Sequence, residues 1–425
     1  MRSTLFFISV FLFFISVIDP ERLFAQDSLE ARTTYKQSVE VLGEGFVNSN
    51  TITNKLFLAF YKGNFIDDAL KENVTERLRS SNLLGGELKS GITYSVTRMH
   101  TSADSKKERA FSFSFYDRQH LDIKFSDDLF YTVFYGNKLF EGSTAHLGDF
   151  NLDILHYQQF RFGWDWKGDR THGSYGFAFS LLNGQKNISA SASTADLFTA
   201  TDGTYLDFNA VMHMHMSDTA STKFFAQNGM GLSADFFYEM PYACWKLPGN
   251  IKFEVKDLGF IRWKSSSMLR SIDSAYHYDG LFVNDILNLS NTSAAPFSVK
   301  KVIDRNTKYN TRQYSTAIPC ELDIRTRTFY SKQIIFEKGI TFWFNTSAQP
   351  YYYARLHFLF GKKKTSDVAY VFGYGGYGRF NSGLDASFDV AKTFSVHLAE
   401  NYLFSGVSSH SNYGQGLMFR LVKRF

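Results

Sequence analysis

The chain has 425 residues, a formal net charge of +5 and a mean hydropathy of −0.22, and 17 % of its residues are aromatic. A charge this small for the length does not indicate a nucleic-acid partner. A chain that is rich in aromatic residues without being hydrophobic on average fits a membrane barrel, whose lipid-facing and water-facing sides cancel. It also fits a soluble all-β protein of two domains.

The first segment has the layout of a secretory signal peptide. A charged start at Arg2 precedes an apolar run over 5–18 and a small residue, Ala25, where we expect cleavage, so that residues 1–25 are removed. A transmembrane anchor is the alternative, but the run is shorter than the ~20 residues that a spanning helix needs. Because no later run reaches that length, any membrane insertion must be by strands. An exported chain could pair Cys244 with Cys320, although the sequence gives no geometric support for a disulfide.

Residues 26–87 are predicted to form an N-terminal segment that lies at the periplasmic mouth or acts as a plug. The run KLFLAFY over 55–61 is interpreted as a short strand or a hydrophobic tether. Residues 66–82 predict an amphipathic helix, which would be either a cap or plug piece or a simple surface helix. Its apolar residues at helical spacing are Ile66, Ala69, Leu70, Val74 and Leu78.

From residue 88 onwards the apolar residues alternate with polar ones, as in half-buried strands. Residues 92–97 and 111–115 predict a hairpin, and 127–139 predicts a short helix tucked into the barrel mouth. Four large aromatic residues share one face of 160–166, which fits a lipid-facing surface better than a solvated one. Further alternating runs occupy 175–181, 188–194, 206–216, 232–238, 251–256, 321–327, 340–344, 352–360, 370–374, 384–390 and 394–401.

The chain ends in GQGLMFRLVKRF, a strand with one apolar face and one cationic face that stops on Phe425. This pattern is typical of the closing strand of a bacterial outer-membrane barrel, and we expect Phe425 to act as an assembly signal for the barrel-assembly machinery. Glu400 falls on the apolar side of its run, so a bulge or a position near the rim is expected there.

The pattern as a whole predicts an all-β fold, a transmembrane antiparallel β-barrel of about 14 strands over 88–425, preceded by a short N-terminal helical or plug segment. Residues 265–316 break the alternation and are interpreted as a long loop or an inward-folded lid. A β-sandwich could reproduce the alternation, but it would not explain why the apolar side is so rich in Phe, Tyr and Trp.

Three stretches carry a family resemblance: 229–240 (GMGLSADFFYEM), 247–264 with its core DLGFIRW at 257–263, and 373–388 (GYGGYGRFNSGLDASF). They resemble an uncharacterised family of Bacteroidota outer-membrane barrels, domain-of-unknown-function family 5723. The resemblance implies a barrel similar to the long-chain fatty-acid transporters, to which the outer-membrane shuttle of type IX secretion is also similar. It supplies no catalytic residues. Its motif positions in this chain are Asp257, Gly259, Arg262 and Trp263.

Imidazole and thioether side chains follow one another over 212–216 (MHMHM), and together they suit copper. On a strand, however, the methionines point one way, toward lipid, while His213 and His215 point the other way, toward the lumen. The two kinds of ligand therefore cannot share one ion, and we expect no metal and no other cofactor.

The remaining lumen-lining candidates are cationic: Arg325, Arg327, Arg355, His357 and Arg420. Charges of both signs inside a barrel often form solvated ladders that rigidify it, while a basic patch could receive a carboxylate headgroup. Nucleotide-binding and zinc-binding signatures and the nucleophile elbow of hydrolases are absent from the sequence, so no enzyme is predicted.

Two functions remain open at this point. The first is passage of a hydrophobic or amphiphilic small molecule through a partly plugged lumen, in a protein whose surroundings are outer-membrane lipid. The second is a barrel that docks exported or envelope proteins, as in type IX secretion, without transport.

Overall fold

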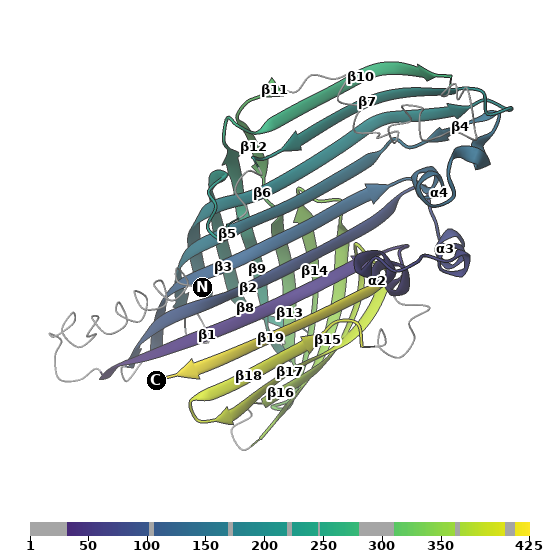
Figure 1. The fold of residues 1–425 in the computed structure, drawn as a ribbon. Helices are drawn as coiled ribbons and strands as arrows, with labels where there is room; N and C mark the ends of the chain where they lie inside the picture. Colours follow the sequence, from purple (N-terminus) through teal and green to yellow (C-terminus); the bar gives the residue numbers. More distant parts are fainter. Residues whose placement is uncertain are drawn as a thin grey trace.

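Fourteen strands form one closed antiparallel ring in the computed structural model, which describes residues 32–101, 106–168, 173–218, 223–244, 247–279, 310–361, 366–403 and 413–425 (Figure 1). The expected leader and the central part of the expected long loop lie outside these residues. The ring contains, in order, β1 (Arg32–Ser49), β2 (Asn82–Thr101), β3 (Lys106–Phe125), β5 (Phe150–Lys167), β6 (Ser174–Thr199), β8 (Gly229–Cys244), β9 (Leu247–Trp263), β13 (Cys320–Phe329), β14 (Ile334–Phe344), β15 (Gln349–Phe360), β16 (Ser366–Gly376), β17 (Phe380–Ala391), β18 (Phe394–Glu400) and β19 (Gly414–Arg424).

The ring closes between its last and first strands, where Gly414 to Arg424 of β19 pair with Asn48 to Ser38 of β1. Closure satisfies the backbone groups that an open sheet edge would expose to lipid. The prediction of an all-β barrel of about 14 strands is therefore confirmed.

The first strand of the ring, β1, corrects the assignment of 26–87 to a segment ahead of the barrel. Its alternation is hard to detect because Gly43 and Gly45 stand on the outward face. The aromatic ring of Phe419 and the side chain of Leu88 cover these two positions, so neighbouring strands supply the apolar surface that β1 lacks.

The start of β1 and the end of β19 lie at the same end of the barrel as the short turns, such as the one between Ala391 and Phe394. The long connections lie at the opposite end, between β1 and β2, β3 and β5, β6 and β8, and β9 and β13. In outer-membrane barrels the short turns face the periplasm and the long connections face outward. We therefore refer to the end with the long connections as the outer end.

Three helices occupy the outer end: α2 (Asn54–Lys62), α3 (Asp68–Thr75) and α4 (Asp127–Tyr135), the last followed by the 3₁₀ turn η1 (Asn137–Phe140). The helix α2 corrects the expected strand or tether at KLFLAFY. Its ends are set by Thr53, whose hydroxyl accepts from Leu56 N–H, and by Gly63 in the left-handed conformation. The helix expected over 66–82 is confirmed only as the shorter α3, with Asp67 as its N-cap.

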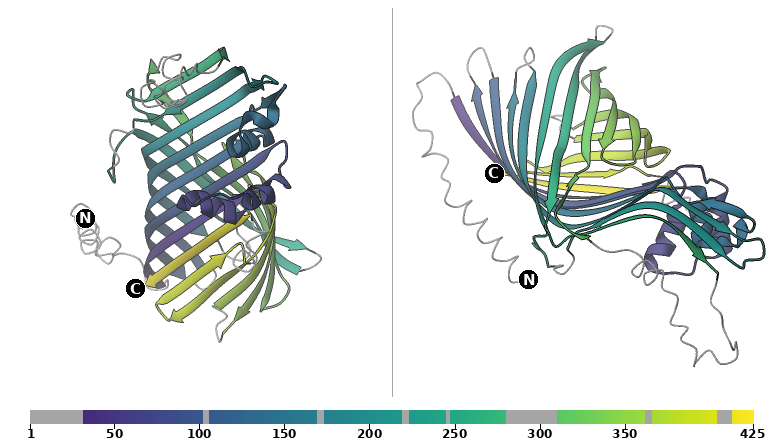
Figure 2. Two further views of the ribbon diagram at one scale, coloured as in Figure 1. Left: turned by 45° about the vertical axis from the view of Figure 1, so that its right-hand side comes forward. Right: turned by 90° about the horizontal axis from the view of Figure 1, so that it is seen from above.

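The rim helices, our name for α2, α3 and α4, pack on the outside of the barrel wall and not in its lumen. Leu56, Val74 and Phe130 form a buried cluster with Phe125, which lies on the same face of β3 as the outward-facing Phe111. The view from above shows the helices on the outer side of the wall (Figure 2). The expected plug piece and the helix tucked into the mouth are therefore both corrected. Within the described residues, no helix is long and apolar enough to span a bilayer.

Large aromatic side chains cover the outside of the ring. On β5, Trp164 packs edge-on against Phe111 of β3 and stacks on Phe177 of β6, with ring centroids 5.5 and 5.1 Å apart. Phe177 is 47 % exposed although aromatic, which fits contact with lipid rather than water. Glu400 is the last residue of β18, at the strand end where a carboxylate can reach the interface.

Beyond the ring, the outer part of β6 continues into a sheet extension with β4 (Ser143–His146), β7 (Leu206–Met216) and β10 (Met268–Tyr278) (Figure 1). The expected barrel strand at 206–216 is therefore part of this extension. The interpretation of 265–316 as a long irregular loop is corrected where β10 and the short strands β11 (Asn310–Thr311) and β12 (Tyr314–Ala317) occur.

Candidate functional site in the barrel interior

The interior of the barrel is layered, and an apolar layer lies near its outer end. Trp263 and Ile261 of β9 are completely buried, and they pack with Tyr157 of β5 and with Ile318. The indole N–H of Trp263 donates to Thr316 Oγ1 at 2.8 Å, which fixes the ring. The family-motif residue Trp263 therefore fills the lumen near its outer end.

A β-bulge in β9 brings Asp257 to the inner face. Two residues, Lys256 and Asp257, oppose the single residue Asp235 of β8, and Asp257 has a φ of 59°. The bulge reverses the alternation of β9, so that Ile261 and Trp263 face inward after it. Beside the bulge, a Cβ on Gly259 would lie 2.3 Å from the Leu232 carbonyl oxygen, so only glycine allows the two strands to approach this closely.

The interior ion cluster consists of Glu87, Arg118, Gln159, Asp235 and Asp257, and it lies directly below the apolar layer. The Arg118 guanidinium bridges two carboxylates: it is 2.5 Å from Glu87 and forms a second ion pair with Asp257. Gln159 Nε2 donates to Asp257 at 2.7 Å, and the Asp257 backbone N–H donates to Asp235 at 2.8 Å. Residues from β2, β3, β5, β8 and β9 are thereby tied together across the lumen.

The arginines expected to line the lumen lie on the inner face and form ion pairs. Arg325 is 3.1 Å from both Asp323 and Glu254. Arg327 and Arg355 share the completely buried Glu337, with Arg355 at 3.2 Å. A cation whose carboxylates are already supplied by the protein is better suited to holding strands together than to receiving a ligand.

The other predicted site residues are spread widely. His357 pairs with Asp367 at 2.8 Å and Arg420 pairs with Glu40 at 3.5 Å, both on the inner face. Two further positions lie away from the lumen: Arg262 is exposed, and Phe425 is 72 % exposed at the end of the sequence. His213 and His215 lie on β7 in the sheet extension, beyond the ring of strands, and the ring of His215 contacts Tyr314, which packs against Trp263.

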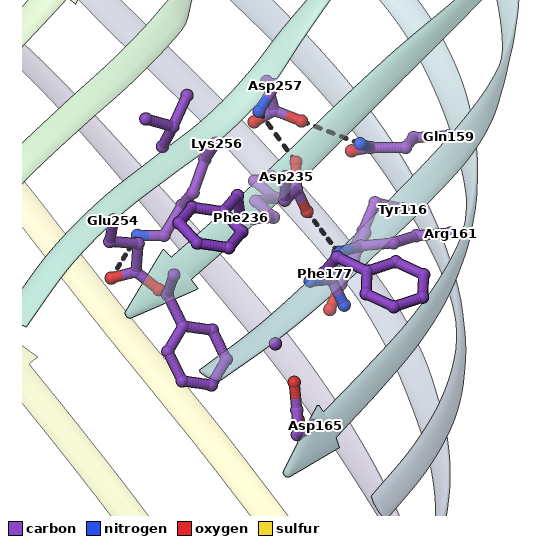
Figure 3. Close-up of a pocket in the computed structure, with 14 residues that line it drawn as sticks. Tyr116, Gln159, Arg161, Asp165, Phe177, Asp235, Phe236, Glu254, Lys256 and Asp257 are labelled. Atoms are coloured by element: carbon purple, nitrogen blue, oxygen red, sulfur yellow. Dashed lines mark hydrogen bonds and ion pairs between the residues drawn. The ribbon is translucent and has the colours of Figure 1, made fainter. Parts of the chain in front are cut away.

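A cavity of about 170 Å³, partly open to solvent, lies next to the ion cluster. Figure 3 shows Gln159, Asp257, Asp235 and Arg161 joined by hydrogen bonds and ion pairs beside it. The rings of Tyr116 and Phe237 also line the cavity, which therefore has both polar and aromatic walls.

Lys89 differs from the other cations of this cavity. Its ammonium group lies 4.6 Å from the centroid of the Tyr116 ring, and within the described residues it forms no ion pair. Arg161 and Lys256, by contrast, are bound to Asp235 and Glu321 at 2.5 and 2.9 Å. Lys89 is thus a half-buried positive charge whose direct partner is an aromatic ring, an arrangement that leaves room for an anion.

The outer mouth is bridged by hydrogen bonds between opposite sides of the ring. Asp122 at the end of β3 accepts from the backbone N–H and the hydroxyl of Ser347, both at 2.8 Å, in the turn between β14 and β15. Asp122 is only 1 % exposed. In the part of the chain that the structure describes, no group of three or more potential metal ligands is present.

A closed ring of antiparallel strands with an aromatic outer surface and a charged interior defines an outer-membrane β-barrel protein. The chain belongs to the Family of unknown function (DUF5723), whose model matches residues 29–392. No curated protein matches the sequence.

Several solved barrels are similar to the chain at low identity. A mutant of the monoaromatic hydrocarbon channel TodX is 8 % identical with a TM-score of 0.37, covering 93 % of this chain and 90 % of that one. The translocator domain of the autotransporter NalP from Neisseria meningitidis is 6 % identical (TM-score 0.30, coverage 95 % and 91 %). The toluene transporter TbuX from Ralstonia pickettii is 8 % identical (TM-score 0.24, coverage 93 % and 89 %).

Proposed function

We propose that the barrel binds an amphiphilic small molecule with an anionic headgroup in its interior cavity and passes it across the outer membrane. The observation that carries the proposal is the pairing of Lys89 with aromatic walls in one cavity. A headgroup would take the ammonium as its counter-ion, and the rings of Tyr116 and Phe237 would contact the first part of an apolar tail.

The cavity is expected to prefer an anion because carboxylates near Lys89 already form ion pairs with other residues. The nearby carboxylates of Asp235 and Asp257 are already bound to Arg161 and Arg118, so they do not compete for Lys89 by direct contact. A cationic amphiphile would instead be repelled by the Lys89 ammonium group, and displacing or desolvating that group would cost free energy.

Binding is tested with radiolabelled dodecanoate and dodecylamine on the purified barrel held in an amphipathic polymer. We expect dodecanoate to bind and Lys89→Gln to weaken its binding about tenfold, or about 1.4 kcal/mol. Lys124→Gln is the matched control, because Lys124 pairs with Asp149 at the outer rim, away from the cavity. Equal binding of the two probes, or an unchanged affinity in Lys89→Gln, would contradict the proposal.

Native mass spectrometry of the protein extracted from its own outer membrane tests whether such a molecule is the natural cargo. A reproducible bound mass of lipid-like size, lost in Lys89→Gln, is the expected result. Co-release of a protein at fixed stoichiometry from an empty barrel would instead favour the docking function.

A further inference from the structure

The helix α2 carries an exposed apolar surface that the barrel itself does not cover. Phe60, Tyr61 and Phe65, at the end of α2 and just after it, are 69, 78 and 88 % exposed. Isolated apolar residues on a surface are ordinary, but three strongly exposed aromatic side chains within six positions are not, and we call these three residues the aromatic patch. Lys62, which is also exposed, stands within the patch.

The opposite side of α2 is fixed to the barrel wall, so the patch has a set direction. Leu56 and Ala59 are buried, and Leu56 belongs to the cluster with Val74, Phe125 and Phe130. Asn54 at the helix start donates to the carbonyl oxygen of Gly414, the first residue of β19, at 2.9 Å. Because one face of α2 and its first residue are both bound to the barrel, the opposite face of the helix stays exposed in a fixed direction.

The patch continues the surface of the barrel that faces lipid. The rim helices cover the same face of β3 that carries Phe111 and its aromatic neighbours further along the strand. On β19, the outward-facing Leu417 is 59 % exposed and stands three residues from Gly414, or about 10 Å along a strand. The aromatic patch of α2 is therefore near the level at which the lipid-facing surface ends.

From this geometry we propose that α2 is an interfacial helix, which rests on the outer leaflet of the membrane with Phe60, Tyr61 and Phe65 among the lipid headgroups. Aromatic side chains favour that depth, and a helix with apolar residues on one face lies in the plane of the interface. Lys62 would bind an anionic headgroup, because basic residues near a charged membrane surface are attracted to anionic lipid. This role is independent of the cavity and of any cargo.

The test places one fluorescent probe on the patch and one elsewhere at the outer end. In a Cys244→Ser, Cys320→Ser background, Phe65→Cys or Asp202→Cys is labelled with a nitrobenzoxadiazole dye, and the full barrel is reconstituted in phosphatidylcholine nanodiscs containing 30 % phosphatidylglycerol (about a third anionic lipid). Asp202 is fully exposed in the turn between β6 and β7 of the sheet extension and serves as the matched control.

We expect spin-labelled lipid, with the nitroxide near the headgroup, to quench the dye at position 65 at least about twofold more strongly than the dye at position 202. Aqueous iodide should quench the dye at position 65 less strongly than the dye at position 202. Adding Lys62→Gln should reduce this difference in nanodiscs with phosphatidylglycerol and leave it unchanged in pure phosphatidylcholine. Equal quenching at the two positions would overturn the proposal.

The patch could instead contact a second copy of the chain. In that case the dye at 65 would be shielded from iodide in a lipid-free amphipathic polymer, and the shielding would increase with protein concentration. This result would also overturn the proposal, whereas a dye exposed in the polymer and shielded in the nanodisc supports it. The labelled single-site variants keep Phe60 and Tyr61, so the helix retains most of its surface.

Discussion

At the scale of single residues, Arg118 joins strands that are not neighbours in the ring, because its guanidinium pairs with two carboxylates from different strands. It pairs with Glu87 on the neighbouring strand β2 and with Asp257 on the more distant β9. Its side chain is 9 % exposed and also lies 5.6 Å from the centroid of the Tyr157 ring. Removing it would leave the buried Asp257 and the half-buried Glu87 without the cation that contacts them.

Arg118→Met should therefore destabilise the folded barrel by about 3–5 kcal/mol, the usual cost of breaking a buried ion pair from one side. Urea unfolding in lipid vesicles measures this change in free energy. Lys71→Met is the control, because Lys71 forms an exposed pair with Asp68 and should cost less than about 1 kcal/mol. Similar effects of the two changes would show that the ion cluster does not hold the strands together.

At the scale of elements, the sequence predicted most strands of the ring, since strict alternation leaves little freedom once one face meets lipid. It failed where the pattern was interrupted for a structural reason. The glycines of β1 removed its apolar signal, and the bulge at Asp257 reversed the alternation of β9. For α2, a run of apolar residues fits helix and strand equally, and the caps at Thr53 and Gly63 decide between them.

The candidate site was predicted less well than the fold. Alternation placed Arg325 and Arg355 on the inward side, but it could not tell a paired cation from a free one, because Glu254 and Glu337 come from other strands. This is also why the sequence did not single out Lys89 and Arg118. The register between strands shows which cation lacks a carboxylate partner, and a single sequence does not contain that register.

The sheet extension has its own prediction, which concerns pH. His277 Nδ1 lies 2.5 Å from Asp207, and this hydrogen bond raises the pKa of the His277 imidazole above its usual value. A raised pKa means that the pair stabilises the extension fully below about pH 6.5 and less as the pH rises through the folded-state pKa. The contact between β7 and β10 should weaken accordingly.

Hydrogen exchange of the β10 amides, corrected for the intrinsic pH dependence of exchange, should therefore be faster at pH 8 than at pH 6. In His277→Gln the corrected rates should no longer differ between the two pH values, because glutamine keeps a polar contact but does not titrate. A pH difference of equal size in this variant would show that another group is responsible.

At the scale of the whole molecule, the ring depends on the fit between β1 and β19. A Cβ at Gly43 would lie 2.2 Å from the ring of Phe419, whereas one at Gly45 would lie 3.2 Å from Leu88. Gly43→Val should therefore lower the fraction of closed barrel well below the wild-type value, while Gly45→Ala is tolerated. The faster migration of folded barrels in unheated detergent gels measures that fraction, and equal folding of both variants would contradict the expected fit.

The pairing of β1 with β19 also determines when folding can end. Asn48 and Gly414 are neighbours in space, but almost the whole chain lies between them in sequence. Bringing them together restricts the conformations of this long segment, and that loss of entropy precedes the stabilising contact between β1 and β19. Until β19 pairs with it, β1 keeps an unpaired edge that could join another chain. The barrel therefore cannot close strand by strand from its first residues, and after export the edge of β1 needs protection until β19 is in place.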